Sequence, residues 1–340
     1  MTRGAESTLS QAWLRRGLLA VALWPVSLVF RGLTAARRLA FRTGLLRSTR
    51  LPVPVVVVGN IFVGGTGKTP LTIWLVDELR RAGLRPGVIS RGYGARNDTP
   101  VEVQPESAPA DVGDEPALIA RRAQCPVVVG RRRVEAAHAL LAAHPEVDVI
   151  VSDDGLQHYA LHRDVEIVLC DERGNGNGWL LPAGPLREPA SRRRDFTVFN
   201  AGRLPNGIPE DALRMGLEGE TAEPLSGGAA PVPLRDLRQR GSRIVAAAGI
   251  GNPSRFFTLL RRAGLEFAEL PLPDHYDFAQ NPFTQVDADL ILITEKDAVK
   301  CARIDTINND PRIWVVPVKA RIDRVLAERI VEKCRGRPTA

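Results

Sequence analysis

A run of small and polar residues, Gly64-Gly65-Thr66-Gly67-Lys68-Thr69, carries the clearest chemical signal in the chain. Glycines let successive backbone N–H groups converge on phosphate oxygens, a lysine reaches the outer phosphates, and a hydroxyl ligates Mg²⁺. The run supplies all three, although Phe62 stands where the usual G-x-x-x-x-G-K-[ST] pattern has its first glycine. It therefore predicts a loop that binds the phosphates of a nucleoside triphosphate.

The residue before the paired glycines narrows the class of protein. Positioning ATPases of the partition type have a lysine at that place and use it across a dimer, whereas this chain has Val63. The loop itself thus argues against a partition-type ATPase.

Two adjacent carboxylates, Asp153 and Asp154, follow an apolar run that ends at Val151. Such a pair is either a solvated turn or helix cap, or a site where a carboxylate holds Mg²⁺ directly or through water. Beside a phosphate loop we favour the metal site. Gln157 and His158 follow within one turn and are candidates to line the same cleft.

Three further polar clusters match no generic motif. Each is either a loop or cap, or part of a functional site. A lone histidine is more often structural, yet a carboxylate paired with a histidine is what deprotonating a sugar hydroxyl requires. The sequence alone does not show whether the clusters meet in space. They are Ser90-Arg91-Gly92-Tyr93-Gly94, Gly113-Asp114-Glu115-Pro116 and Asp274-His275-Tyr276-Asp277.

Two runs of three arginines occupy residues 131–133 and 192–194. Such runs are usually solvated faces, although an anionic phospholipid substrate or a nucleotide needs charge of this kind. Among these arginines we favour Arg133 as a residue of the cleft.

The elements that must position these residues alternate between strand and helix. A β-branched run from Val53 to Val58 leads into the phosphate loop and is typical of a buried parallel strand. A helix over 69–82 follows, because leucines recur at helical spacing and Gly83 is a common stop. The alternation indicates an α/β fold: a P-loop NTPase-like, mostly parallel sheet flanked by helices, with ligands beyond the carboxyl ends of the strands. Further strands are predicted at 86–90, 126–129, 147–151 and 165–169, and a helix at 134–143.

The composition changes to proline, glycine and alanine between about residues 202 and 240, which favours a linker or an elaborated connection. A second, smaller α/β unit follows. Its strands are predicted at 243–248, 290–294 and 313–316.

An apolar stretch with a basic rim lies near the start of the chain. No charged residue occurs from Gly17 to Phe30, and arginines flank these fourteen residues. A spanning helix needs roughly 20 residues, and Pro25 would kink the segment, so we do not expect it to cross a membrane. The stretch is a signal peptide, a buried core helix or a helix at the membrane interface. Trp13, Trp24 and the arginines favour the interface.

The 340-residue chain carries a net charge of +7, which fits an acidic partner such as phosphate, anionic lipid or nucleic acid. Nucleic acid is disfavoured, because only 5% of residues are aromatic and the sequence has no recognition-helix, zinc or RNA-stacking motif. Four widely spaced cysteines without a Cys-x-x-Cys pair argue against a disulfide framework and structural zinc, and favour a reducing, cytoplasmic location.

In combination, the motifs closely resemble the tetraacyldisaccharide 4'-kinase family of lipid A synthesis. The resemblance runs from about residue 10 to 320 and is weak only around 218–234. Phe62 departs from it, because relatives have a small hydroxyl residue there. The matching segments are Val58-Gly59-Asn60 with 64–70, and then 90–94, 113–116, 152–158, 178–188, 248–251 and 294–300.

The resemblance implies transfer of the γ-phosphoryl group of ATP to the 4'-hydroxyl of a membrane-held, tetraacylated glucosamine disaccharide 1-phosphate, with Mg²⁺ required. By motif position, Asp114 is the base and His275 assists it. Lys68 and Thr69 hold phosphate and Mg²⁺, while Asp153 and Asp154 serve the metal. The remaining substrate or cleft positions are Arg91, Tyr93, Glu115, Arg133, Gln157, His158 and Glu188.

The resemblance also implies two α/β domains joined by a linker. We divide the chain into a basic amphipathic membrane-associating segment at 1–48, a P-loop kinase core at 49–205, a connection at 206–240, and a second α/β domain at 241–335 that contributes to the cleft.

We therefore expect a lipid A disaccharide kinase on the cytoplasmic face of the inner membrane, held there by its N-terminal helix. The expected partners are the lipid A disaccharide 1-phosphate precursor and an anionic membrane surface, without nucleic acid or an obligate protein partner. The competing hypothesis is a membrane-associated regulatory ATPase that switches partners and modifies no small molecule.

Overall fold

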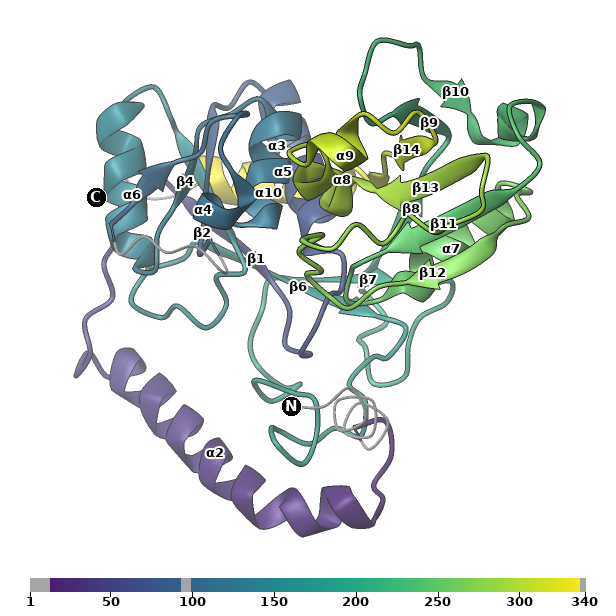
Figure 1. Cartoon of the computed structure of the whole chain (residues 1–340). Helices are drawn as coiled ribbons and strands as arrows, with labels where there is room; N and C mark the ends of the chain where they lie inside the picture. Colours follow the sequence, from purple (N-terminus) through teal and green to yellow (C-terminus); the bar gives the residue numbers. More distant parts are fainter. Residues whose placement is uncertain (1–12, 93–98, 337–340) are drawn as a thin grey trace.

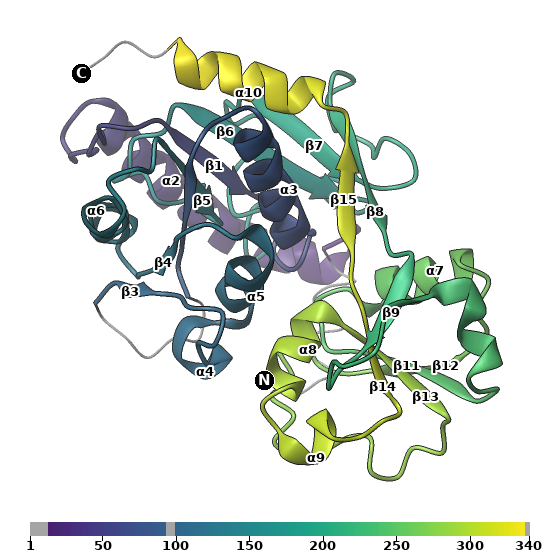
Figure 2. The ribbon, with the colours of Figure 1, turned by 90° about the horizontal axis from the view of Figure 1, so that it is seen from above.

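Two sheets lie side by side in the computed structural model, which describes residues 13–92 and 99–336 (Figure 1). The larger sheet has nine strands in the order β15-β8-β7-β6-β1-β5-β2-β4-β3, and the smaller has six in the order β10-β9-β14-β13-β11-β12. Each sheet and the helices packed on it form one lobe, called here the large lobe and the small lobe (Figure 2). The predicted α/β class is confirmed.

Strand β1 (Val55–Gly59) lies at the centre of the large sheet and pairs in parallel with two neighbours, β5 (Val149–Asp153) and β6 (Val165–Asp171). All five residues of β1 are buried, as its β-branched composition predicts. Strand β5 begins two residues later than expected and continues to Asp153, so its first aspartate belongs to the strand itself. The other strands on this side of β8 are β2 (Pro86–Ser90), β3 (Val101–Glu102), β4 (Val127–Val129) and β7 (Phe196–Asn200).

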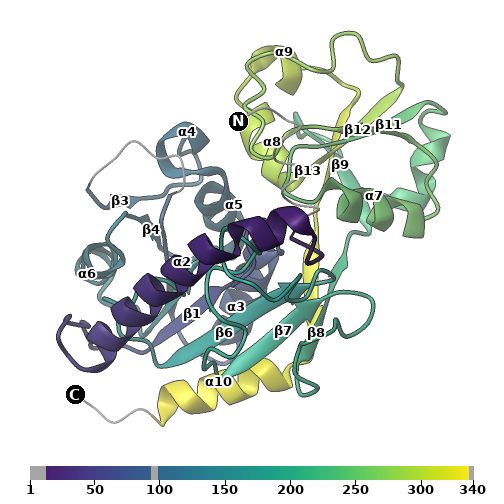
Figure 3. The ribbon, with the colours of Figure 1, turned by 90° about the horizontal axis from the view of Figure 1, so that it is seen from below.

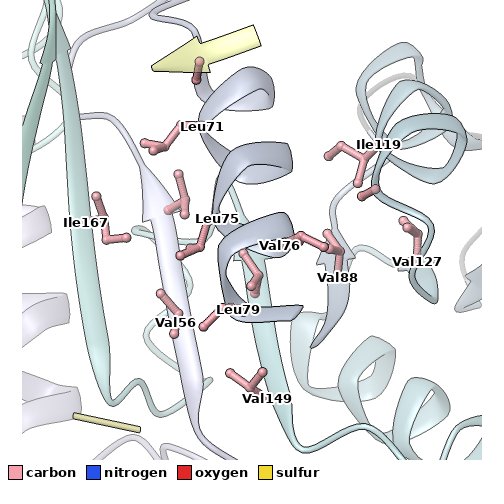
Figure 4. Close-up of a cluster of buried hydrophobic side chains, with 14 of the residues drawn as sticks. Val56, Leu71, Leu75, Val76, Leu79, Val88, Ile119, Val127, Val149 and Ile167 are labelled. Atoms are coloured by element: carbon pink, nitrogen blue, oxygen red, sulfur yellow. The ribbon is translucent and has the colours of Figure 1, made fainter. Parts of the chain in front are cut away.

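Helix α3 (Lys68–Arg81) follows the phosphate loop and covers the large sheet. Its Leu71, Leu75 and Leu79 recur at helical spacing, are fully buried, and lie against Val56 and the neighbouring strands (Figure 4). This packing fixes the direction in which the helix start points. The other helices of the large lobe are α4 (Pro109–Val112), α5 (Asp114–Ala123), α6 (Arg133–Ala143) and α10 (Val325–Arg335).

Replacing Leu75 with alanine is expected to lower the free energy of unfolding by about 2–5 kcal/mol, because it leaves a cavity between α3 and the sheet. Urea unfolding followed by circular dichroism measures the loss. The control is Arg81→Ala, which removes a mostly exposed side chain from the same helix and is expected to change stability by less than about 1 kcal/mol. Equal effects of the two substitutions would contradict the packing described for Leu75.

Residues 206–240, predicted to be a linker or an elaborated connection, contain strands of both sheets. β8 (Leu213–Glu218) pairs with β7 and β15 in the large sheet, and β9 (Thr221–Pro224) pairs with β14 in the small one. β10 (Val232–Pro233) and a 3-10 helix, η1 (Leu234–Gln239), follow. These elements have many small residues, and they form because their backbones pair with neighbouring strands. A hydrophobic pattern along the sequence does not reveal such pairing.

The small lobe contains the rest of the predicted second unit. Its remaining strands are β11 (Ile244–Ala248), β12 (Ala268–Pro271), β13 (Leu290–Thr294) and β14 (Ile313–Val316), with helices α7 (Pro253–Arg262), α8 (Glu295–Cys301) and α9 (Asp305–Asn308).

The chain then returns to the large lobe. β15 (Lys319–Ile322) pairs antiparallel with β8, and Leu326 and Ile330 of α10 join the core beneath α3. Residues 319–335, which the sequence pattern groups with the second unit, therefore pack on the first. The chain passes between the lobes at 219–220 and 317–318, and a Cβ atom on Gly219 would lie 3.2 Å from the carbonyl oxygen of Pro317.

Helix α2 (Leu18–Arg42) has 25 residues and continues through Pro25 and Arg31, so the expectation of a stretch too short to span a membrane is wrong. It is the one helix among the described residues that is long and apolar enough to cross a membrane by length and composition. Figure 3 shows it lying across the large lobe.

Contacts on one side of α2 hold it to the large lobe, and its other side is exposed. Ser27 Oγ donates to the carbonyl oxygen of Leu180 at 2.8 Å, and the rings of Trp24 and Trp179 lie 6.3 Å apart. The exposed apolar side chains of the helix include Leu18, Val29, Leu33 and Leu39. This exposure contradicts the interpretation of the segment as a buried core helix.

Candidate functional site

The phosphate loop, residues 60–67, connects β1 to α3. Gly64 and Gly67 have φ values of +99° and +98°, a left-handed conformation that side chains with a Cβ rarely adopt. Gly67 directly precedes the first turn of α3, whose free N–H groups and positive dipole end therefore face the loop. The loop is thus shaped and polarised to hold an anion.

Asn60 holds the loop in this shape, and sequence reasoning assigned it no role. Its Nδ2 donates to the carbonyl oxygens of Phe62, at 2.7 Å, and Gly64, at 3.0 Å. Its Oδ1 accepts from Lys68 Nζ at 3.5 Å. Both bonds that Nδ2 makes are to backbone, so the unusual Phe62 leaves this part of the cradle unaffected.

Asp153 and Asp154 lie next to Lys68 but in different environments. Asp153 is fully buried and accepts hydrogen bonds from Thr72 at 3.1 Å and Ser90 at 3.4 Å, and burial raises its pKa to about 7. Burial would also raise the pKa of Asp154, but the charges of Lys68, at 3.6 Å, and Arg187, at 3.5 Å, outweigh it and lower that pKa. The pair therefore offers one partly exposed carboxylate, Asp154, and one held deep in the sheet, Asp153.

Asp114 and His275, 161 residues apart in the chain, meet between the lobes. Asp114 is the first residue of α5, and its Oδ2 lies 3.2 Å from His275 Nδ1 and 3.1 Å from Lys300 Nζ of α8. Burial opposes ionisation of Asp114, yet the His275 hydrogen bond and the Lys300 charge together lower its pKa. The arrangement keeps Asp114 as a carboxylate.

A second ion pair runs beside the first. Lys296 Nζ lies 3.2 Å from Glu115 Oε1 and 3.5 Å from His275 Nε2. The pKa of Glu115 is lowered, because the charges of Lys296 and Lys68 outweigh the effect of its burial. Arg122 and Glu295 form a third pair between α5 and α8, so charged side chains from both lobes build this part of the site.

A cavity of about 1280 Å³ between the lobes extends from the phosphate loop to the Glu115–Lys296 ion pair. Lys68 and Thr69 line it from the loop, and Glu115 and Lys296 line it from α5 and α8. It continues past β8, η1 and α7, where Arg214, Leu234 and Leu259 contribute to its wall. The anion-binding loop thus opens on this cavity, and the Asp114–His275 pair lies next to its Glu115–Lys296 wall, an arrangement suited to phosphoryl transfer to a hydroxyl.

The model of the family described as Tetraacyldisaccharide-1-P 4'-kinase matches residues 19–335 of this chain. The chain belongs to the tetraacyldisaccharide-1-phosphate 4'-kinase family. It is therefore a phosphotransferase with an alcohol group as acceptor.

Curated relatives of this kinase carry the same name. It is 65% identical to the tetraacyldisaccharide 4'-kinase of Janthinobacterium sp. (strain Marseille), over 98% of each chain. It is 61% identical to that of Herminiimonas arsenicoxydans, over 98% of this chain and 97% of the relative. A crystal structure of LpxK from Aquifex aeolicus, described as an "apo" form in complex with ATP, matches with a TM-score of 0.76 at 29% identity. That match covers 93% of this kinase and all of the other chain.

Three of the predicted cleft residues of the kinase are bonded within the large lobe. Arg133 is buried and donates to the carbonyl oxygens of Gly130, at 2.9 Å, and Asp153, at 3.3 Å. It therefore holds the end of β5 in place through the backbone of Asp153. Gln157 Nε2 donates to Glu188 Oε1 at 3.0 Å, and the same oxygen accepts from Arg192 at 2.9 Å. Gln157 and Glu188 therefore bond to each other here.

His158 lies near several arginines, and their charges affect its pKa. Burial, followed by the charges of Arg133 and Arg91, lowers its pKa to about 4, so it is neutral at physiological pH. Arg91 itself is exposed at the end of β2. Tyr93, predicted with it, lies outside the residues that the structure describes.

Sequence reasoning missed several polar residues of this kinase's site. Thr72 and Arg187 bond to the two aspartates, and Lys296 and Lys300 bond to Glu115 and Asp114. The two lysines occur in the segment 294–300 that supports the family resemblance, and their spacing of four on one helix was the signal that could have identified them.

Proposed function

We propose that this kinase transfers the γ-phosphoryl group of ATP to the 4'-hydroxyl of a tetraacylated glucosamine disaccharide 1-phosphate. The observation that carries the proposal is that the cavity lined by the phosphate loop is also lined by Glu115 and Lys296, beside which Asp114 and His275 of the two lobes form their pair. Membership of the family supports the acceptor, and the ATP complex of the Aquifex aeolicus relative supports the donor.

The residues of the loop fit ATP and Mg²⁺. Thr66 Oγ1 and Asp154 Oδ1 are buried and have no hydrogen-bond partner among residues 13–92 and 99–336, as expected of atoms that serve a ligand. The described residues contain no cluster of three or more His, Cys, Asp or Glu side chains suited to a metal. Mg²⁺ usually binds through one or two carboxylates plus substrate phosphates, which suits Asp153, Asp154 and the Thr69 hydroxyl.

Mg²⁺, when bound, neutralises negative charge on the phosphoryl oxygens. The remaining chemistry belongs to side chains of this chain. Lys68 places a positive charge beside the loop, and Asp114, kept ionised by the His275 hydrogen bond and the Lys300 charge, is the group that accepts the proton of the attacking hydroxyl. His275 fixes the orientation of that carboxylate through its Nδ1.

One assay separates this function from that of a regulatory ATPase. The purified kinase is incubated with γ-labelled ATP, Mg²⁺ and a lipid A disaccharide 1-phosphate acceptor in mixed micelles. We expect label in the lipid, whereas a regulatory ATPase would release only inorganic phosphate at a rate that ignores the acceptor.

We further propose that α2 holds the kinase at the cytoplasmic face of the inner membrane. Its exposed apolar side chains suit the acyl region of a bilayer, and Arg31, Arg37 and Arg38 on the same helix suit anionic headgroups. The acceptor carries acyl chains, so an enzyme held at the surface meets it where it resides.

Introducing two acidic residues on the exposed side of α2, Val29→Glu with Leu33→Glu, is expected to weaken binding to anionic vesicles by about tenfold or more. The substitutions replace exposed apolar side chains that suit the bilayer with negative charges that the vesicle repels. Flotation with vesicles of phosphatidylcholine and phosphatidylglycerol measures it. The matched control is Leu204→Glu, an exposed leucine outside the helix, which should float as the unaltered protein does. Equal flotation of all three proteins would refute the membrane role of α2.

A further inference from the structure

Asp171, the last residue of β6, is a buried carboxylate that binds an arginine from each lobe. Arg173, in the loop after β6, donates through Nε to Oδ1 at 3.0 Å and through Nη2 to Oδ2 at 2.5 Å. Arg255, in the first turns of α7, places its Nη2 2.9 Å from Oδ2. Asp171 is 1% exposed, so the three side chains form a fixed bracket between the lobes.

Each arginine of the bracket also donates to the backbone of the phosphate loop. Arg173 Nη2 lies 3.2 Å from the carbonyl oxygen of Gly65, and Arg255 Nη1 lies 3.1 Å from that of Thr66. A trans peptide unit is planar, and its C=O and N–H point in opposite directions. Holding these two carbonyls toward the arginines therefore turns the N–H groups of Thr66 and Gly67 the other way, and such N–H groups are what a phosphate loop offers to phosphate.

Arg255 and its neighbours also hold the small lobe close to the phosphate loop. Glu172 accepts from Arg255 Nη2 at 2.7 Å and from Asn252 Nδ2 at 2.8 Å, which ties the start of α7 to the large lobe. A Cβ atom on Gly251 would lie 3.0 Å from the backbone nitrogen of Gly65, so only glycine permits this approach without displacing the loop. Arg255 reaches the Thr66 carbonyl because the lobes are this close.

We propose that Arg255 is a positioning residue for the phosphate loop, so that the shape of the ATP site depends on a side chain of the small lobe. Arg173 supplies the equivalent contact from within the large lobe. Asn200 Nδ2, also from the large lobe, donates to the same Thr66 carbonyl at 3.3 Å and shares the task of Arg255. The inference rests on the proposed function only in taking ATP as the ligand of the loop.

Isothermal titration of the full-length protein with ATP and Mg²⁺ tests the role of Arg255. Arg255→Ala is expected to raise the Kd for ATP about fivefold to tenfold, and Arg255→Lys less, because an ammonium group keeps the charge but not the forked contacts. Arg261→Ala is the matched control, because Arg261 lies on the same helix and pairs with Glu269 at the surface. It should bind ATP within twofold of the unaltered protein.

Combining Arg255→Ala with Asn200→Ala distinguishes an effect through the loop from direct contact with ATP. Two donors that share one carbonyl replace each other in part, so we expect the double variant to lose more affinity than the product of the single losses. Asn200→Ser replaces Asn200→Ala if thermal unfolding without ATP shows that the alanine variant is not folded. Losses that simply multiply, or an unchanged Kd in Arg255→Ala, would overturn the inference. Failure of the unaltered protein to bind ATP would instead overturn the proposed function.

Discussion

Replacing Lys68 with alanine should lower kcat for phosphoryl transfer by about a hundredfold to a thousandfold. Phosphoryl transfer depends on positioning and on stabilising charge at the phosphoryl oxygens, and Lys68 Nζ is the cation placed between the loop and Asp154. Its side chain is 9% exposed, so water does not readily replace it. Initial rates with labelled ATP and the lipid acceptor measure the loss.

The matched control for this variant is Lys319→Ala, which removes an exposed lysine from β15. We expect its kcat to equal that of the unaltered enzyme. Near-full activity of Lys68→Ala would reject the phosphate-loop assignment, whereas equal losses in both variants would point to a general effect of lost positive charge.

Replacing Asp114 with asparagine should abolish most turnover and leave ATP binding within about twofold. The amide oxygen can still accept a hydrogen bond from His275, and the Arg122–Glu295 and Lys296–Glu115 pairs still join α5 to α8. It cannot take up the proton of the attacking hydroxyl, and loss of such a base costs about 10²–10⁴ in rate. Single-turnover transfer and ATP titration, performed on the same preparation, separate the two effects.

Asp111→Asn is the control for the Asp114 variant, because Asp111 is an exposed carboxylate on the neighbouring helix α4. It should retain full turnover. If Asp114→Asn instead lost ATP binding, Asp114 would belong to the nucleotide or metal site. The base would then have to be His275, the other residue of the pair.

Local patterns indicated the half of the candidate site that lies at the carboxyl ends of β1 and β5. The β-branched residues of β1 and the leucines of α3 fix a strand, a loop and a helix in order, and each predicted boundary lies within two residues of the observed one. Asp153 ends β5 and Asp154 follows it, at the same edge of the parallel sheet as the end of β1, so their place beside the loop follows from topology.

The other half of the site depends on contacts that local patterns do not contain. Asp114 and His275 meet only because α5 packs on α8 across two lobes, and no periodicity records a contact over 161 residues. Helix α2 exceeds its apolar stretch because it continues beyond Phe30 to Arg42, about three further turns that include four arginines. The strands within 206–240 form through their neighbours and not through their own composition.

The two crossings between the lobes, at 219–220 and 317–318, have a mechanical consequence. Each crossing is two residues long, and the two lie side by side, so together they act as a hinge between the lobes. Sliding or twisting of the small lobe would pull the two crossings in different directions and strain them. Bending about the line that passes through both crossings strains neither. Bending about this line is therefore the motion of the small lobe that we expect once its ion pairs to the large lobe, such as Arg255–Asp171, have opened. Gly251 over the loop and His275 at Asp114 travel on that same lobe, so a single swing opens the donor and acceptor ends of the site together. Spent nucleotide and phosphorylated lipid are thus expected to leave in the same opening.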